Sequence, residues 1–354
     1  MGVRQETLQN FLQGLENGYN DVPYHNSAHA ACVCHSVHWI LTNNREVAAL
    51  SERPIELFAA VLAAMAHDMN HSGHNNAFHV ASASDLAMLY SDQSVLEMHH
   101  LNSIFQLLKL EECALLAKLS VERRKEVRDT IISMVLATDL AVNFPTINEF
   151  KAMLNEWVPP DADGPERTTT RPPARTRRQS MKMAKKLSIG GLPLGVYAED
   201  LFSAHSNTIT KKEKTLILKM ILKVSDISNV TKGKSYTLAW TERVVQEFFD
   251  QGDLEATLSL PVTPMMDRNT ACVPKQQIGF YNFVAKPMFE VMDLLVPMEH
   301  ALSNLAGMYQ HWETLIPTEA KAAVSAPRRE SEFKRLSEAP RRGSRYSHRG
   351  SKIA

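Results

Sequence analysis

The stretch around residue 67 brings together side chains of the kinds that bind metal ions. His67 and Asp68 directly follow Ile55–Ala66, an almost purely apolar run that is too short to span a bilayer and indicates a buried helix. His71 lies four residues after His67, so both imidazoles would share one face if that helix continued. Buried imidazole and carboxylate groups are costly unless they are paired or bound to metal. The stretch is therefore either a metal site or a polar helix end whose histidines are satisfied by hydrogen bonds.

Histidines gather in one part of the chain, which favours a polar site over isolated core residues. Ten of the fourteen lie between residues 25 and 100, including His25 and His29, which are again four residues apart. Two imidazoles and two carboxylates form a mixed nitrogen and oxygen set that suits zinc or another borderline divalent cation and leaves positions for water. The candidate metal ligands are His29, His67, Asp68 and Asp226.

A second cation can share this site. If Asp68 bridges with both of its oxygens, it can also hold a harder ion, Mg²⁺ or Mn²⁺, which keeps most of its water. Acceptors for that water are available at His71, Glu97 and Thr138. Two neighbouring cations activate a water molecule and clamp a phosphoryl oxygen, which is typical of metal-dependent phosphohydrolases.

Helices must position these residues. The apolar pattern predicts helices at residues 1–20, from the 21–29 turn to about 41, and at 55–66, 80–110, 121–143, 211–226, 240–251 and 278–316, the last interrupted at Pro287 and Pro297. In the first of these, one side carries Leu8, Phe11, Leu12 and Leu15. Residues 252–276 contain three prolines and are predicted to form a long loop. Because few segments alternate with period two, we expect an all-α fold.

Composition excludes several classes of protein. With 44% hydrophobic and 22% charged residues, the 354-residue chain is ordinary for a globular protein with a large core. Its formal net charge is zero, so bulk electrostatics implies no nucleic-acid or membrane partner. The four cysteines form no CxxC pair and no disulfide framework, and no signal peptide or membrane segment is evident, so we expect a cytoplasmic protein.

Basic residues concentrate in two segments that carry almost no apolar material. Residues 158–195 are predicted to be a disordered basic insertion, and residues 318–354 a disordered basic tail. We expect residues 1–317 to form one domain around the insertion.

Six motifs occur in an order that resembles the class I 3′,5′-cyclic nucleotide phosphodiesterases, whose catalytic domain is a compact multi-helix fold with an HD-type metal site. The likeness covers roughly residues 20–317, apart from the insertion. The motifs are Tyr24-His25-Asn26-x-x-His29, His67-Asp68-x-x-His71-x-Gly73-x-x-Asn76, Leu96-Glu97-x-His99-His100, Ala137-Thr138-Asp139, Asp226-Ile227-Ser228-Asn229 and Gln277-Ile278-Gly279-Phe280.

The resemblance implies a reaction and roles for residues. It implies hydrolysis of cyclic nucleotides, cGMP or cAMP, to nucleoside 5′-monophosphates by a hydroxide that two metals activate, which would terminate cyclic nucleotide signalling. His25 matches the general acid that protonates the departing O3′, a task that suits imidazole because its pKa lies near working pH. Zinc would occupy the four candidate ligands, and Mg²⁺ or Mn²⁺ would bind Asp68 and water.

The resemblance also implies a nucleotide pocket. Gln277 matches the glutamine that reads the purine edge, since an amide offers both a donor and an acceptor, and Phe280 and Val244 match a hydrophobic clamp on the ring. Further candidate lining residues are Tyr24, Leu140, Asn229, Phe248 and Met265.

Short similarities narrow the resemblance to the cGMP-specific subfamily usually numbered nine. They are the segments 260–268 and 286–290, and Cys32, which stands where most subfamilies carry aspartate. They favour cGMP slightly as the substrate. Only 23 residues precede the Tyr24 motif, so we expect that the helices normally found before it are truncated here.

Two other functions remain open. An HD-type nucleotidase shares the histidine and aspartate ligand set but does not need the Gln277 motif or Glu97. A catalytically impaired binding protein would hold cyclic nucleotide without cleaving it, and the loss of a metal ligand would be its mark. No ligand is lost here.

The basic segments repeat a pattern of two cations at positions −3 and −2 from a serine, which resembles the substrates of cyclic-nucleotide-dependent protein kinases. Arginine- and serine-rich disorder generates such patterns freely, so the alternative is a plain linker. Each phosphate adds about −1.5 to −2 charge, which would turn a cationic segment nearly neutral. The candidate phosphorylation sites are Ser180, Ser188, Ser331, Ser337 and Ser344.

Overall fold

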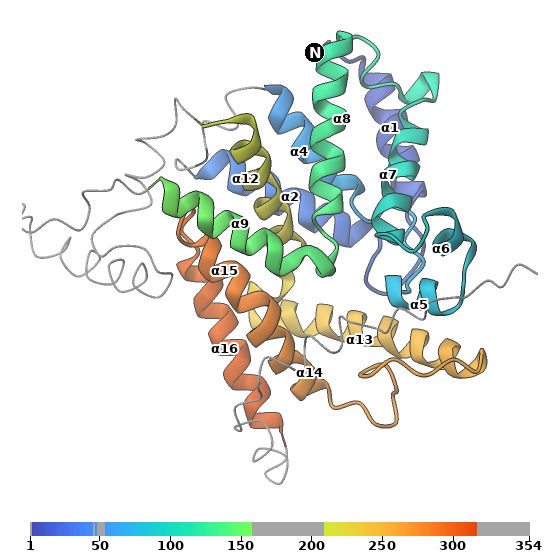
Figure 1. The fold of residues 1–354 in the computed structure, drawn as a ribbon, viewed down its shortest axis with the longest axis vertical. Coiled ribbons are helices and arrows are strands. Elements are labelled where there is room, and N and C mark those ends of the chain that lie inside the picture. The colour runs from blue at the N-terminus through green and yellow to red at the C-terminus, as the bar shows by residue number, and fades with distance from the viewer. Residues whose placement is uncertain (1, 45–46, 48–53, 158–208, 317–354) are drawn as a thin grey trace, which may run out of the picture. The chain divides into compact units, whose positions relative to one another are not determined.

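In the part of the chain that the structure describes, every regular element is a helix (Figure 1), which confirms the all-α fold. The structure is a computed structural model, and it describes residues 2–44, 47, 54–157 and 209–316. The predicted insertion at 158–195, the predicted tail at 318–354 and the five candidate phosphorylation serines lie outside these residues. The described residues up to Leu315 belong to one compact unit.

The first half of the described chain supplies the helices that precede the predicted insertion. They are α1 (Gln5–Asn17), α2 (Ser27–Asn43), α4 (Pro54–Ala66), α5 (Asn76–Ala81), α6 (Asp85–Leu89), α7 (Val95–Leu107), the 3-10 turn η1 (Glu111–Cys113), α8 (Val121–Leu136), the 3-10 turn η2 (Leu140–Val142) and α9 (Asn143–Glu156).

The second half begins at residue 209. Its elements are α12 (Lys211–Asp226), the 3-10 turn η4 (Ser228–Thr231), α13 (Lys234–Thr257), α14 (Val273–Phe280), the π-helical turn η5 (Tyr281–Ala285), α15 (Lys286–Met292) and α16 (Glu299–Leu315).

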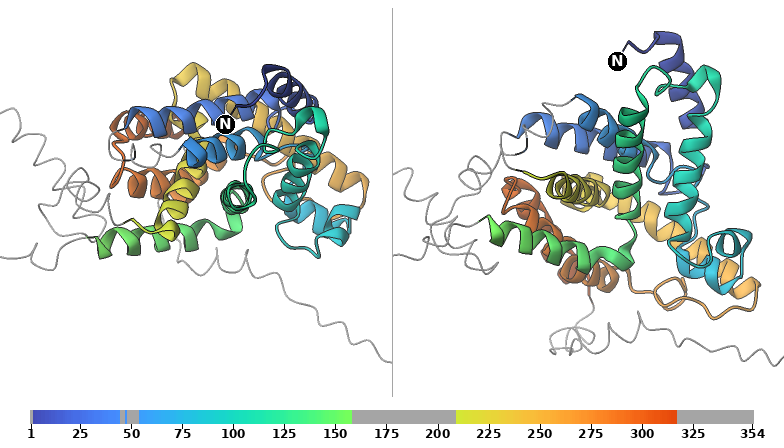
Figure 2. Two further views of the ribbon diagram at one scale, coloured as in Figure 1. Left: turned by 90° about the horizontal axis from the view of Figure 1, so that it is seen from above. Right: turned by 45° about the horizontal axis from the view of Figure 1, so that its top comes forward.

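Two helices that are buried over most of their surface carry the centre of the core. The apolar α4 packs against α2 on one side and α8 on another, and seven of its residues are buried. Helix α12 contacts α2, α8 and α9, and nine of its residues, from Leu216 to Ser225, are buried. Figure 2 shows α12 between α9 and α2, with α8 seen end-on in its left view. Both buried helices therefore end inside the unit, where polar groups would be costly without partners.

Several predicted elements differ from the observed ones. Helix α4 ends at Ala66, as the predicted 55–66 helix does, and the chain turns directly afterwards, so the condition under which His67 and His71 would share a helix face is not met. The single helix expected at 80–110 is broken, since Ser91, Asp92 and Ser94 have positive φ angles that end α6 and precede α7. In α1, Phe11 is buried, but Leu8 and Leu12 are exposed.

The loop predicted at 252–276 is shorter than expected. Helix α13 continues to Thr257, and α14 already begins at Val273. At Gly252 a Cβ atom would lie 2.1 Å from the carbonyl oxygen of Met266, so only glycine lets the returning loop pack this closely. The expected interruption at Pro287 takes the form of the π-helical turn η5, which directly precedes α15, and the proline lies in the first turn of α15.

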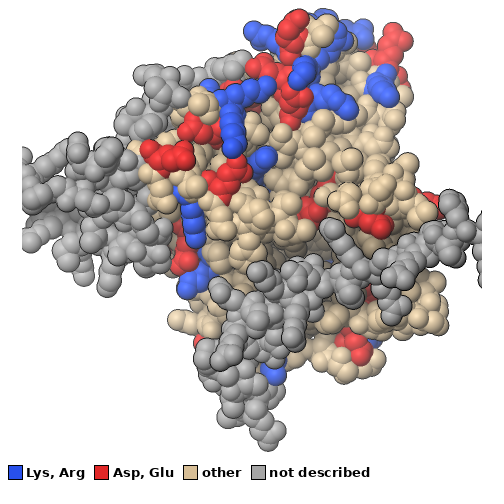
Figure 3. Space-filling model, in the orientation of Figure 1, with Lys and Arg blue, Asp and Glu red and all other residues tan. Residues whose placement is uncertain are grey.

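Charged side chains of both signs lie over the upper end of α8 in the orientation of Figure 1, as Figure 3 shows. This visible area carries mixed charge rather than charge of one sign. Among the described residues no single helix is long and apolar enough to cross a membrane. Helices Val121–Leu136 and Leu140–Glu156, bent by 86° at their junction, pass that test only as a pair.

Candidate metal centre and active site

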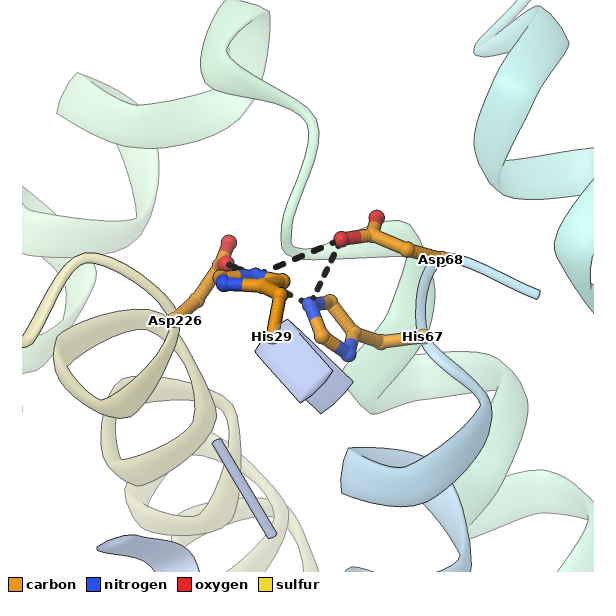
Figure 4. A group of neighbouring side chains, drawn as sticks. All are labelled: His29, His67, Asp68 and Asp226. Carbon is orange, nitrogen blue, oxygen red and sulfur yellow. Dashed lines mark hydrogen bonds and ion pairs between the residues drawn. The ribbon is translucent and has the colours of Figure 1, made fainter. Parts of the chain in front are cut away.

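The four predicted metal ligands meet at one point, although they come from three separate segments (Figure 4). The Oδ1 atom of Asp226 lies 3.0 Å from Nε2 of His29 and 3.3 Å from Nε2 of His67. The Oδ2 atom of Asp68 lies 2.9 Å from the same His67 nitrogen and 3.5 Å from that of His29. Two imidazole nitrogens and two carboxylates therefore converge, as the sequence predicted.

Helix ends place these ligands. Asn26 caps α2, with its Oδ1 atom accepting hydrogen bonds from the N–H groups of Ala28 and His29, which fixes the first turn of the helix. His67 directly follows the last residue of α4, and Asp226 is the last residue of α12. Because both helices are anchored in the core, their ends are held rigidly.

The hydrogen bonds leave unshared electron pairs facing the centre of the cluster. The carbonyl oxygen of Ala64 lies 2.9 Å from Nδ1 of His67 and can only accept, so Nδ1 carries the proton. Nε2 is then the nitrogen that faces the carboxylates, and it offers a lone pair to a cation when the ring is neutral. Buried Oδ2 of Asp68 has no hydrogen-bond partner, since its short approach to His67 lacks suitable hydrogen-bond geometry. A buried carboxylate facing an imidazole lone pair fits a divalent cation between them.

The electrostatics of the cluster agree with this chemistry. Burial opposes the ionised form of Asp68, but the neighbouring His67 outweighs it and holds the pKa of Asp68 well below its ordinary range. The pKa of Asp226 is lowered for the same reason, with a further contribution from His29. Burial lowers the pKa of His67, yet the two carboxylates outweigh it and raise this pKa well above its ordinary value. A proton thus competes with a cation for this position.

His25 is paired with a glutamate that the sequence analysis missed. Nδ1 of His25 donates to Oε1 of Glu247, whose other oxygen accepts the backbone N–H groups of Tyr24 (3.0 Å) and His25 (3.2 Å). Burial would lower the pKa of His25, but the Glu247 carboxylate outweighs it, and the pKa is raised. With 25% of its side chain exposed, His25 lies at the edge of the site, and the Glu247 carboxylate favours the protonated form of its ring.

Two more histidines stack behind His25. The rings of His25 and His71 lie 4.0 Å apart, and those of His71 and His100 lie 5.6 Å apart. His25, His71 and Glu247 are also close enough together to hold a cation. The hydrogen bond between His25 and Glu247 already uses that space, so we interpret this group as a proton-donating pair.

The expected role of His71 needs a correction. Nδ1 of His71 accepts the N–H of Gly73 at 3.0 Å, and burial keeps the pKa of the ring well below its ordinary value. The neutral ring therefore carries its proton on Nε2 and offers a donor, not the acceptor that we expected. The sequence analysis gave His100 no role, but its Nε2 atom lies 3.8 Å from Oδ1 of Asp68.

Glu97 lies in the first turn of α7, and Thr138 lies in the turn between α8 and η2. Oε2 of the buried Glu97 accepts a hydrogen bond from Asn76 at 3.0 Å, and Asn76 also accepts the N–H of Leu96. Burial, followed by the repulsion of Asp139, raises the pKa of Glu97 to about 7. Thr138 donates its hydroxyl proton to the carbonyl oxygen of Val135 at 2.7 Å, which leaves its oxygen free to accept.

The predicted nucleotide-pocket residues occupy α13, α14 and adjacent turns. Gln277 and Phe280 line one small cavity with Trp312, and Phe280 also packs against the core. Asn229 accepts a hydrogen bond from the hydroxyl group of Tyr24 at 3.3 Å, so these two predicted residues are joined. The half-buried Val244 and Phe248 lie on α13 on either side of Glu247, while Leu140 and Met265 are more than half exposed.

Comparison with known proteins gives a family. Residues 24–305 match the family model described as 3′5′-cyclic nucleotide phosphodiesterase. The chain is 36% identical over 301 residues to the probable 3′,5′-cyclic phosphodiesterase pde-1 of Caenorhabditis elegans, covering 84% of this chain. It is 33% identical over 287 residues, or 80% of the chain, to the dual specificity calcium/calmodulin-dependent 3′,5′-cyclic nucleotide phosphodiesterase 1B of Mus musculus. It spans 37% and 44% of the lengths of these two relatives.

Solved structures agree with the match. The phosphodiesterase domain of the RhoPDE fusion protein from the choanoflagellate Salpingoeca rosetta is 27% identical, with a TM-score of 0.69. The comparison covers 88% of this chain and 84% of that one. The structure of LmjPDEB1 in complex with IBMX is 26% identical, with a TM-score of 0.70 over 89% of this chain and 81% of that one. The chain belongs to the 3′,5′-cyclic nucleotide phosphodiesterase family.

Proposed function

We propose that this chain hydrolyses 3′,5′-cyclic nucleotides to nucleoside 5′-monophosphates. One observation carries the proposal. The cluster of His29, His67, Asp68 and Asp226 can hold a cation, and near it lies His25, whose protonated form is favoured by its hydrogen bond to Glu247. Relatives of the chain are named as enzymes of this reaction, which supports the same conclusion.

The donor set suggests which cations the site takes. Two imidazoles and two carboxylates suit Zn²⁺, so His29, His67, Asp68 and Asp226 would form the tight site. Asp68 would also hold Mg²⁺ or Mn²⁺, with the oxygens of Glu97 and Thr138 accepting from its water and His71 donating nearby. Two bound divalent cations supply an activated water molecule and withdraw charge from a phosphoryl oxygen.

The roles of the chain's own residues follow from their hydrogen bonds. Glu247 anchors Nδ1 of His25, so the opposite ring nitrogen, Nε2, is the one that would protonate the departing O3′. The bonds from Glu247 to the N–H groups of Tyr24 and His25 fix the position of the ring. The stacked His71, kept neutral by burial, fills the space behind His25 without competing for its proton.

The base would bind on the other side of the site. We propose that Gln277 reads the purine edge and that Phe280 and Val244 hold the ring, with the further lining residues at Tyr24, Leu140, Asn229, Phe248 and Met265. Cys32, which accepts a hydrogen bond from Tyr236, and the 260–268 segment favour the cGMP-specific subfamily numbered nine and hence cGMP. Relatives reported above bear the names of another subfamily, so this finer assignment stays a prediction.

The test is incubation of the protein with cAMP, cGMP and a 5′-mononucleotide, with and without divalent metal, and chromatography of the products. We expect metal-dependent formation of 5′-AMP or 5′-GMP and no change in the 5′-mononucleotide. Release of phosphate from the mononucleotide would indicate an HD-type nucleotidase instead. Cyclic nucleotide that is bound but not cleaved, with metal present, would indicate a catalytically impaired binding protein.

A regulatory proposal concerns the basic segments outside the described residues. We propose that a cyclic-nucleotide-dependent kinase phosphorylates this cytoplasmic protein within them. Since its substrate would activate that kinase, the result would be feedback control. Treatment with the kinase and mass spectrometry would decide it, and absence of phosphate at all five candidate serines would refute it. These serines are Ser180, Ser188, Ser331, Ser337 and Ser344.

A further inference from the structure

The turn from Ala137 to Asp139, which joins α8 to η2, is fixed at its first residue by a buried lysine. Lys223 lies on α12 with only 2% of its surface exposed, and its Nζ atom donates to the carbonyl oxygen of Ala137 at 2.5 Å. Among the residues that the structure describes, no other lysine or arginine is buried. A buried ammonium group is costly, so its retention at this turn needs a reason.

The same turn is fixed at its last residue by a serine that begins another helix. Ser94 precedes α7, where a serine normally caps the helix with its hydroxyl group, yet it makes no such bond. Its hydroxyl donates instead to Oδ2 of Asp139 at 2.8 Å. Its backbone has φ 40° and ψ 53°, a left-handed conformation that is unfavourable for serine. The chain thus gives up a helix cap and accepts backbone strain to make a bond between α7 and the turn.

Thr138 stands between these two attachments. Since its hydroxyl proton is used by Val135, the only remaining capacity of its oxygen is to accept. Glu97, in the first turn of α7, is the other acceptor that we assign to the water of the weaker cation. The Ser94 bond connects the start of the helix that carries Glu97 to the turn that carries Thr138, so it sets the relation between the two acceptors.

The positive charge of Lys223 interacts with carboxylates of the same region. Burial lowers the pKa of Lys223 to about 8. The carboxylates of Asp226, Asp139 and Glu97 act in the opposite direction and favour the protonated lysine. Lys223 therefore relieves the repulsion among carboxylates that must stay close together, and Glu97 and Asp139 do repel each other.

We propose that Lys223 and the bond between Ser94 and Asp139 are positioning groups of the weaker cation site. They hold the 137–139 turn against α7 so that Thr138 and Glu97 accept from the same shell of water. This inference rests on the proposed function, because that proposal assigns Glu97 and Thr138 to the second cation.

The experiment measures Mg²⁺ binding directly, apart from turnover. The unfolding temperature of zinc-loaded protein is followed against Mg²⁺ concentration, and zinc content is measured by mass spectrometry. The variants are Lys223→Met, Ser94→Ala and Asp139→Asn. Matched controls are Lys219→Met, four residues earlier on α12, and Ser103→Ala on α7, whose hydroxyl bonds only to the carbonyl oxygen of His99 in its own helix.

We expect the Mg²⁺ midpoint to rise about 10-fold or more in Lys223→Met and less in Ser94→Ala and Asp139→Asn, with zinc content unchanged. The sign is diagnostic. Loss of a positive charge near a cation site would by itself tighten Mg²⁺ binding, so weaker binding in Lys223→Met reports lost positioning. Lys219→Met and Ser103→Ala should leave the midpoint unchanged.

An unchanged or lowered Mg²⁺ midpoint in all three variants would overturn the inference, even if their unfolding temperatures fell, because that pattern describes a purely structural role. If Lys223→Met does not fold, Ser94→Ala and Asp139→Asn decide the result. Failure of the proposed function looks different, since the wild-type protein would then bind Mg²⁺ and zinc but cleave no cyclic nucleotide.

Discussion

The candidate metal side and the candidate nucleotide side of this site are built differently. On the metal side, His29 and His67 are at most 2% exposed, and Asp68 is 9% exposed. On the nucleotide side, Leu140 and Met265 are 58% and 56% exposed. The first side is held by hydrogen bonds to helix ends, whereas the second offers apolar surface with few bonds. In the proposed function, the reaction would therefore use the more buried, rigid half, and recognition of the base would use the more exposed, adaptable half.

The largest effect should come from removing a ligand on the rigid side. Asp226→Ala leaves two imidazoles without the carboxylate that both approach, so turnover should be abolished and zinc affinity should fall more than about 100-fold. Zinc content after dialysis and product formation measure the two effects. A zinc-replete Asp226→Ala protein with near-normal activity would show that the rigid half is not the catalytic one.

Removal of the proposed proton donor should reduce turnover less than Asp226→Ala does, and it should leave zinc binding unchanged. His25→Ala is expected to keep its zinc and to lose about 10²–10⁴-fold in kcat.

Glu247→Gln removes the carboxylate that raises the pKa of His25, so the acid loses its proton at lower pH. The alkaline limb of the pH profile of kcat/KM should therefore move to lower pH in Glu247→Gln. Gln246→Ala, an exposed neighbour on α13, is the control, and an unmoved limb would argue against the pair.

Glu97 should make the stability of the metal-free protein against unfolding depend on pH. Its pKa is 4.5 ordinarily and about 7 when folded, so the folded state binds more protons between these values and stability falls as pH rises from 4.5 to 7. The loss is on the order of 3 kcal/mol at most. Glu97→Gln should flatten this slope in urea unfolding of chelator-treated protein. An identical slope in wild type and variant would mean that Glu97 is ionised throughout.

The smallest effect should come from the adaptable side. Gln277→Ala should weaken kcat/KM by roughly 1–3 kcal/mol, because a buried purine edge loses its hydrogen-bond partner. Zinc content should not change. Gln276→Ala, which removes a bond to the carbonyl oxygen of Met265, is the neighbouring control and should have less effect. Equal kcat/KM values for wild type and Gln277→Ala with both cAMP and cGMP would place base recognition elsewhere.

The sequence was sufficient for the all-α fold and for the four residues that converge in the candidate metal cluster, because periodic apolar residues and short motifs are local signals. His67 and Asp68 are adjacent in the chain, and His29 and Asp226 each belong to a short motif of their own. The end of α4 at Ala66 was predictable in the same way, because the apolar run stops at His67, whereas the breaks within 80–110 depend on backbone conformations at Ser91, Asp92 and Ser94 that apolar periodicity does not indicate.

Glu247 and Lys223 show where sequence reading fails. Glu247 lies 222 residues from His25 on a helix with many charged residues, and nothing nearby distinguishes it from a glutamate that faces solvent. Lys223 could not be recognised from the sequence either, since lysines are usually exposed. Only the packing of α12 and α13 buries these charges, and burial is what makes them bonding partners of the site.

Helix α13 carries residues that we assign to both base recognition and proton donation, which affects how base preference can change. Its 24 residues extend about 36 Å, and a single stretch carries Val244, Glu247 and Gln251 at the three- and four-residue spacing of one helix face. Gln251 accepts the N–H of Asn75, next to the asparagine that holds Glu97. A substitution on α13 that reshapes the base pocket would therefore also disturb the proton donor and the cation water. Under the proposed function, a new specificity should therefore be easier to obtain by substitutions on α14, which carries Gln277 and Phe280, than by substitutions on α13.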